Sequence, residues 1–132
     1  MFKRIFRLKG KDINFLMRKR RYFTFGYFGF FYYDQYPNLK FNQISVNIPL
    51  KYSKKAVVRN SLKRKIVSFL QNEGYIKKSI GGKFYKIFVN LNKKNIGELK
   101  SQTEKFDKRE VNHYILKEFQ KSFFSFSKKI GR

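Results

Sequence analysis

Residues 56–66 read AVVRNSLKRKI and form the centre of the segment that most strongly predicts a helix. Ser53 suits the N-cap of a helix from Lys54 to Asn72, and Gly74 suits the left-handed position beyond its end. Apolar side chains recur along the segment at helical spacing: Val58, Leu62, Ile66, Phe69 and Leu70. We therefore expect one face of this helix to pack and the other to meet solvent or a ligand.

The other side of the predicted helix is polar and strongly basic. Seven such residues crowd into twelve positions: Lys54, Lys55, Arg59, Asn60, Lys63, Arg64 and Lys65. A run of charge is ordinarily a solvated surface, but almost nothing acidic shares this one. Arginine can bind two phosphate oxygens or stack on a base, and lysine supplies a point charge. Basic residues at this density beside aromatic strands indicate an RNA-binding surface.

The whole chain is basic, with 32 Lys and Arg against 8 Asp and Glu and a formal net charge of +24. Such an excess favours binding to a polyanionic partner. Neutralising the phosphates of that partner releases counterions, and binding also relieves the repulsion among the positive charges of the free protein. The 17 Phe and 9 Tyr suit binding to either nucleic acid or a lipid interface. A genome rich in AT codons would also explain part of this aromatic and lysine-rich composition. The length fits one domain, residues 1–132, whose ends (1–10 and 125–132) we expect to be extended or frayed.

Three segments predict strands. Tyr22–Tyr33 (YFTFGYFGFFYY) reads as one long aromatic strand, in which Gly26 and Gly29 mark bulges or close backbone approaches. Ile44–Leu50 alternates apolar and polar residues, as a half-buried strand does, and should end near its proline. Phe84–Leu91 (FYKIFVNL) reads as a further strand.

Two more helices flank these strands. Asp12 can cap a short first helix, Ile13–Arg21, whose apolar residues share one face. A last helix, Asp107–Phe124, begins with a capping-box pattern and continues with apolar residues at four-residue spacing. The polar stretch Asn92–Phe106 before it reads as an insertion or loop.

The sequence offers no group of side chains suited to protein catalysis. His113 is the only histidine and has no apparent partner, and the 8 acids are scattered, several of them at expected caps and turns. No cysteine is present, which excludes a disulfide-linked partner and a thiolate metal site. No apolar run suits a secretory signal or a membrane span. We therefore expect a cytoplasmic protein without a membrane partner.

The segment Ala56–Ile66 resembles the signature of the bacterial ribonuclease P protein family, in which Ala-Val precedes Arg-Asn-Arg, one apolar residue and Lys-Arg. Four charged or polar positions match that signature: Arg59, Asn60, Lys63 and Arg64. Ser61 replaces its second arginine, and Val67 stands where a further arginine is usual. Arg7–Ile13 (RLKGKDI) is similar to the family's N-terminal Arg-Leu, basic stretch and Asp-Phe.

The resemblance implies an α+β fold in a single small domain. The family has a central mixed sheet of about four strands, with elements in the order α-β-β-α-β-α. It also has an unusual left-handed crossover, which places the basic helix beside the sheet. This crossover is implied by the resemblance alone.

For function, the resemblance implies the protein subunit of ribonuclease P, an endoribonuclease whose catalysis is carried by RNA. The basic helix would bind the catalytic RNA, and a cleft between the sheet and the first helix would hold the 5′ leader of precursor tRNA. The candidate leader-binding residues are Met17, Phe28, Phe30 and Tyr32, although the same rings could build the core of the sheet. The protein itself would supply no catalytic residue, and Mg²⁺ would be held mainly by the RNA.

Two other hypotheses remain open at this point. A non-catalytic ribosomal or other structured-RNA-binding protein would explain the size, the charge and the missing active site equally well. A peripheral membrane protein would use the lysines and aromatic residues on anionic lipid. The apolar stripe on the central helix argues against a peripheral membrane protein, because in a globular protein this stripe would pack against the sheet and would not be left for lipid.

Overall fold

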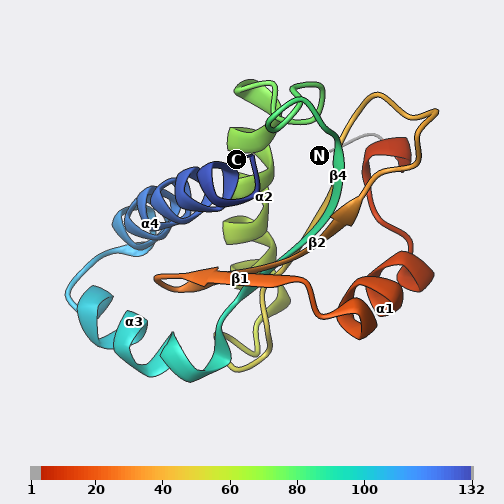
Figure 1. The fold of residues 1–132 in the computed structure, drawn as a ribbon. Helices are drawn as coiled ribbons and strands as arrows, with labels where there is room; N and C mark the ends of the chain where they lie inside the picture. The colour runs from red at the N-terminus through yellow and green to blue at the C-terminus, as the bar shows by residue number, and fades with distance from the viewer. Residues whose placement is uncertain (1–3, 132) are drawn as a thin grey trace.

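The structure is a computed structural model that describes residues 4–131 (Figure 1). The strands are β1 (Tyr22–Phe25), β2 (Phe28–Asp34), β3 (Gln43–Asn47) and β4 (Tyr85–Leu91). The helices are α1 (Gly10–Lys19), α2 (Ala56–Asn72), α3 (Ile96–Thr103) and α4 (Lys108–Ile130), with short 3-10 helices η1 (Arg4–Phe6) and η2 (Lys93–Asn95). The predicted order of elements is therefore right except for one extra strand and one extra α-helix.

The four strands form one mixed sheet in the order β1-β2-β4-β3. β1, β2 and β4 pair antiparallel, whereas β3 pairs parallel with β4. Parallel neighbours need a crossover connection, and α2 provides it between β3 and β4. The expected α+β class with a mixed sheet of about four strands is confirmed. The left-handed sense of the crossover stays a prediction from the resemblance.

The aromatic segment is a β-hairpin, and the prediction of one long strand was wrong. Phe25 pairs with Phe28, so only two residues form the turn between β1 and β2. Gly26 begins this turn with a φ of 61°, which is the pattern of a type II′ turn. Because aromatic residues lie on both sides of the turn, the sequence pattern does not show where one strand ends and the next begins. Gly29 marks a close approach, as expected, because a Cβ there would overlap the ring of Tyr22.

The core lies between the sheet and the pair α2 and α4, whereas α1 lies on the opposite side of the strands (Figure 1). Alternate residues of β2 and β4 point into this core, among them Phe28, Phe30, Ile87 and Val89, all with no exposed surface. The rings of Phe30 and Phe126 stack with centroids 4.5 Å apart. Burying one such side chain contributes about 1.5–3 kcal/mol.

α2 starts slightly later than predicted and ends as predicted. Ser53 is not its N-cap; Lys55 is, and the Ser53 hydroxyl accepts a hydrogen bond from the Lys55 backbone at 3.2 Å. Beyond the helix, Gly74 has a φ of 73° and Tyr75 N donates to Leu70 O at 3.0 Å. These are features of a Schellman motif, which satisfies the last carbonyls of the helix. The predicted apolar stripe faces the core.

α1 begins before the predicted position. Asp12 is therefore not the N-cap but lies in the first turn, where its carboxylate accepts a hydrogen bond from Lys9 N at 3.2 Å. This contact satisfies one of the free N–H groups at the start of the helix. The helix ends at Lys19, and its C-cap Arg20 has a left-handed φ of 58°.

The C-terminal third is more helical than predicted. The stretch expected to be a loop holds η2 and α3, because Ile96, Leu99 and Thr103 form a buried stripe. Asp107 caps α4 with a capping box, as predicted. Residues 125–130 continue α4 rather than fraying, because Phe126 has no exposed surface. The predictions for residues 1–3 and 132 lie outside the described residues.

Candidate nucleic-acid interface

The basic side of α2 lies open to solvent. Lys54, Lys55, Asn60, Arg64 and Lys65 are exposed, and Arg59 and Lys63 are half-buried. Among the side chains described for residues 5–131, the ion pairs are Arg21 with Asp34, Lys86 with Asp12, and Lys121 with Glu118. None of them involves α2, so no acid of the described chain neutralises this surface.

Arg59 is held in place by the loop before α2. Its Nη1 donates a hydrogen bond to the backbone oxygen of Ser53 at 2.9 Å. A guanidinium group has five N–H donors, so the group keeps others for an anion. The contact fixes this arginine beside the first turn of α2, next to the exposed Lys54 and Lys55.

The two departures from the family signature are accommodated by packing. Ser61 is half-buried, and its hydroxyl accepts a hydrogen bond from Asn112 Nδ2 of α4 at 3.1 Å. Val67 is 4% exposed and belongs to the core. A long charged side chain at either position would meet the rest of this protein rather than open solvent.

A cleft lies on the other side of the sheet, beside α1. Its floor is a row of rings across three strands, because Tyr22 pairs with Phe31 and Phe31 pairs with Phe88. The cleft has a volume of about 580 Å³, and Ile13 and Met17 of α1 form one wall. We call it the sheet cleft, and its further lining residues include Asn47, Pro49, Asn90, Asn92, Lys93 and Lys94.

Hydrogen bonds hold the polar lining of the sheet cleft in place. The Tyr22 hydroxyl donates to Asn92 Oδ1 at 3.0 Å, and Asn47 Nδ2 donates to Asn90 Oδ1 at 3.1 Å. The rings of Tyr22 and Phe31 lie 4.6 Å apart between centroids. Partly exposed rings, amide groups and two exposed lysines suit a single-stranded nucleic acid, whose bases stack on rings while its phosphates bind cations.

The candidate leader-binding residues divide between the two sides of the sheet. Met17 is 49% exposed and lies in the wall of the sheet cleft. Phe28 and Phe30 have no exposed surface and pack against α4, so the prediction that a base stacks on them was wrong. Tyr32 is half-buried on the same side as Phe28 and Phe30, where its ring packs against Phe126.

Strand alternation explains this result. Successive residues of a strand point to opposite faces, so the rings available on the open face are those one position away. Tyr22, Phe31 and Phe88 line the sheet cleft but were missed by sequence reasoning. The signal was present in β4, where Ile87, Val89 and Leu91 alternate with residues of the open face, including Phe88.

Groups suited to chemistry are scarce elsewhere. His113 is exposed on α4, and residues 4–131 contain no group of three or more His, Cys, Asp or Glu side chains that could hold a metal ion. Among the helices described, none has the length and apolar character needed to cross a bilayer. The arrangement suits binding of an anionic polymer at two surfaces.

Comparison with known proteins identifies the fold. The chain is similar to the RNase P protein of Thermotoga maritima in complex with 1-(4-fluorophenyl)-2-thiourea, at 23% identity and a TM-score of 0.59, covering 84% of this chain and 94% of that one. A second Thermotoga maritima RNase P protein structure gives 22% identity and a TM-score of 0.57, covering 84% of this chain and 92% of that one. The Staphylococcus aureus RNase P protein gives 15% identity and a TM-score of 0.59, covering 87% and 93%.

Sequence comparison adds nothing to these structural likenesses. No protein-family model matches the chain, and no curated protein is significantly similar to it in sequence. The structures nevertheless cover most of both chains in every pair, which agrees with the resemblance seen in residues 56–66. This chain has the fold of the bacterial ribonuclease P proteins.

Proposed function

We propose that this chain is the protein subunit of ribonuclease P and promotes 5′ maturation of precursor tRNA. In this proposal the basic side of α2 binds the catalytic ribonuclease P RNA. The sheet cleft binds the single-stranded 5′ leader of precursor tRNA. The fold and the signature in residues 56–66 both support this assignment.

One observation carries the proposal: the loop between β3 and α2 takes part in both candidate surfaces. Pro49 lines the sheet cleft, and four residues later Ser53 accepts the hydrogen bond from Arg59 of α2. In our proposal an RNA strand that leaves the cleft beside Pro49 continues toward the basic helix. One small protein can in this way contact both a single strand and a folded RNA.

The contribution of the protein in this proposal is electrostatic and steric. Its cations lower the repulsion between the catalytic RNA and the substrate, and the cleft extends substrate contact beyond the cleavage site. The acids of the described residues do not form a cluster that fits Mg²⁺, so we assign the magnesium ions to the RNA. This assignment and a cytoplasmic location follow from the proposal.

The test is cleavage of the 5′ leader by the cognate RNA with and without the protein. We expect the double substitution Arg59→Ala and Arg64→Ala to slow cleavage at low magnesium by about tenfold or more, since each arginine removed costs a charged contact. High magnesium should restore most of the rate. The matched control is Lys117→Ala with Lys129→Ala, which removes two exposed charges from α4.

The RNA that copurifies with the protein separates this proposal from a ribosomal role. A ribonuclease P subunit should recover one structured RNA that is distinct from ribosomal RNA. Migration with ribosomal subunits, together with no effect on cleavage at low magnesium, would contradict the proposal. It would instead favour a non-catalytic structured-RNA-binding protein.

A further inference from the structure

A second hollow lies on the other flank of α1. It is walled by Phe15 of α1, Tyr33 of β2 and Tyr36 of the following loop, and it has a volume of about 520 Å³. This volume is in the range of small-ligand sites. We call it the α1 hollow. It belongs to the same open face of the sheet as the sheet cleft, because Tyr33 is two residues along β2 from Phe31.

Of the three rings of the α1 hollow, that of Tyr36 is the one open to a flat group, because Lys19 and Arg21 already lie over the ring of Tyr33. Phe15 and Tyr33 make an edge-to-face pair with centroids 5.1 Å apart. Tyr36 is 56% exposed, and the ammonium of Lys86 lies 3.9 Å from the centroid of its ring. One face of the Tyr36 ring is thus held by a cation, and its exposed surface remains for a ligand.

The base of the hollow is fixed by a buried ion pair. Lys86 is 4% exposed, and its Nζ donates a hydrogen bond to Asp12 Oδ1 at 3.0 Å. The other acid in the lining, Asp34, pairs with Arg21 at 3.5 Å. Each of the two carboxylates in the lining is therefore paired with a cation of the protein.

Two further cations, Lys11 and Arg18, also line the α1 hollow, and neither makes an ion pair within residues 4–131. They are free to meet phosphates. A nucleotide offers the two groups that this lining suits, a flat base for the rings and a phosphate for the cations.

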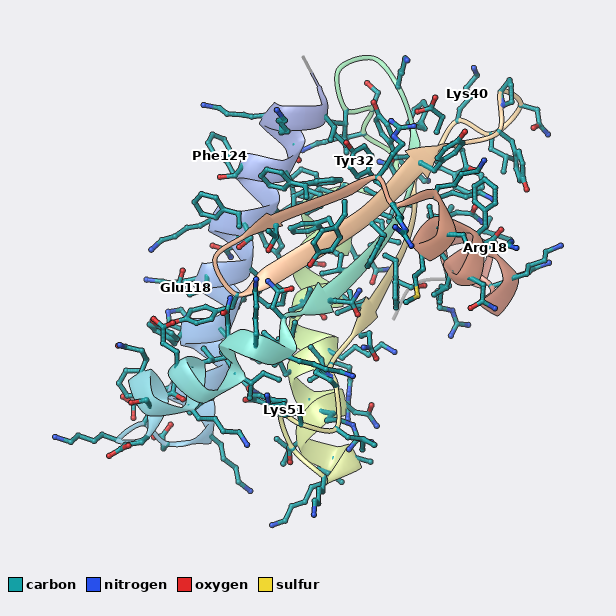
Figure 2. The ribbon with its side chains drawn as sticks, turned by 60° about the horizontal axis from the view of Figure 1, so that its bottom comes forward. Arg18, Tyr32, Lys40, Lys51, Glu118 and Phe124 are labelled. Carbon is teal, nitrogen blue, oxygen red and sulfur yellow. The ribbon has the colours of Figure 1, made fainter. Side chains whose placement is uncertain are left out.

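The two hollows are joined over the outer side of α1. A shallow depression there is lined by Lys11, Asn14, Met17, Arg18 and Arg20. Met17 also lines the sheet cleft, and Lys11 and Arg18 also line the α1 hollow. The three hollows are therefore neighbours around α1, and cations line the middle one. Figure 2 places Arg18 on the side of the strands away from Glu118 and Phe124 of α4.

We propose that the α1 hollow is a second base-stacking site for single-stranded RNA, reached from the sheet cleft across α1. The proposal rests on the proposed function, which assigns the first part of the RNA strand to the sheet cleft. It adds that a strand long enough to cross α1 places a base against Tyr36 and its phosphates against Lys11 and Arg18. Affinity should therefore rise again once the strand is long enough to reach the second site.

The test uses oligouridylates of about four and about twelve nucleotides, lengths that span the site sizes of single-strand binding modules. We expect the longer strand to bind the unmodified protein more tightly. Tyr36→Leu should weaken binding of the longer strand by about fivefold and leave the shorter strand unchanged. Phe124→Leu is the matched control, because Phe124 is an exposed ring on α4.

A direct readout comes from iodouridine placed at the two ends of the longer strand. Photocrosslinks assigned to single residues by fragment mass spectrometry should join one end to Phe31 or Phe88, and the other end to Phe15, Tyr33 or Tyr36. Urea unfolding of the Tyr36→Leu protein checks that it folds. Equal weakening of both strands, or crosslinks at the distant end that avoid the α1 hollow, would overturn the proposal.

The failure of the proposed function has a different result. If Tyr36→Leu weakens the longer strand but the protein does not affect leader cleavage at any magnesium concentration, the second site stands and the ribonuclease P assignment falls. If the protein promotes cleavage and Tyr36→Leu does not change the binding of either RNA strand, the ribonuclease P assignment stands and the second site falls.

Discussion

The two sides of the sheet carry the same kinds of side chain and use them differently. Toward α2 and α4, Phe28 and Phe30 are fully buried and pack against the rings of α4. On the open side, Phe31 and Tyr33 are half-buried and line the two hollows. Neighbouring residues of one strand thus serve the core and the candidate site in turn. Position in the strand, and not residue type, decides the role.

The largest test of this contrast is a pair of adjacent substitutions in β2. Phe30→Ala should lower the free energy of unfolding by about 3–5 kcal/mol, because it leaves a cavity among the rings of α4. Phe31→Ala should cost clearly less, since Phe31 already meets solvent. Urea unfolding measures both. Equal losses would show that the open face is as tightly packed as the core.

The ion pair between Asp12 and Lys86 is the main polar contact between α1 and the open face. Asp12→Asn should lower the free energy of unfolding by about 3 kcal/mol, since it would leave the buried ammonium of Lys86 without its carboxylate partner. Adding Lys86→Met should recover part of this loss, because it removes the unpaired charge. A double variant less stable than Asp12→Asn alone would contradict the explanation.

The same pair predicts how stability depends on pH. Burial acts to raise the pKa of Asp12, but hydrogen bonds from Lys86 and the Lys9 backbone, with nearby cations, outweigh it and hold the pKa below 3.8. The contribution of Asp12 is therefore present above the unfolded-state pKa and is lost as pH falls through the lower folded-state pKa. The difference between the unmodified protein and Asp12→Asn should shrink over that acidic range, as measured by urea unfolding.

Sequence reasoning recovered the parts of the molecule that local patterns determine. Helical spacing and Gly74 placed α2, and the basic residues around Arg59 and Arg64 lie open as expected. The hairpin was missed because its turn, Gly26 with an aromatic neighbour, lies inside a run of rings. α3 was missed because its buried stripe of three residues is short and its other positions are polar.

The candidate leader site required information that no local pattern contains. Which rings of β2 face the open side depends on the register with β1 and β4 and on which face α4 covers. Met17 could be chosen because the resemblance places the cleft beside the first helix. Tyr36 lies outside every predicted strand or helix, so only the folded chain brings it beside Lys86.

The rings of the sheet cleft give the next largest effect, and it should appear in binding rather than in stability. Phe88→Leu keeps an apolar side chain at the floor of the sheet cleft but removes a stacking surface. The binding of a short oligouridylate should therefore weaken by about 1–3 kcal/mol. Phe124→Leu on α4 is the control. Fluorescence anisotropy with a labelled strand measures both. A similar loss in the control would mean that binding does not depend on the cleft.

The smallest expected effect concerns the position where the family signature is broken. Asn112→Ala removes the hydrogen bond to Ser61 and should lower the free energy of unfolding by about 0.5–1.5 kcal/mol. A double-mutant cycle with Ser61→Ala isolates the contact. Because this contact joins α2 to α4 and leaves the exposed cations in place, affinity for the catalytic RNA should not change. A marked loss of RNA affinity would show that the packing of α4 controls the basic side of α2.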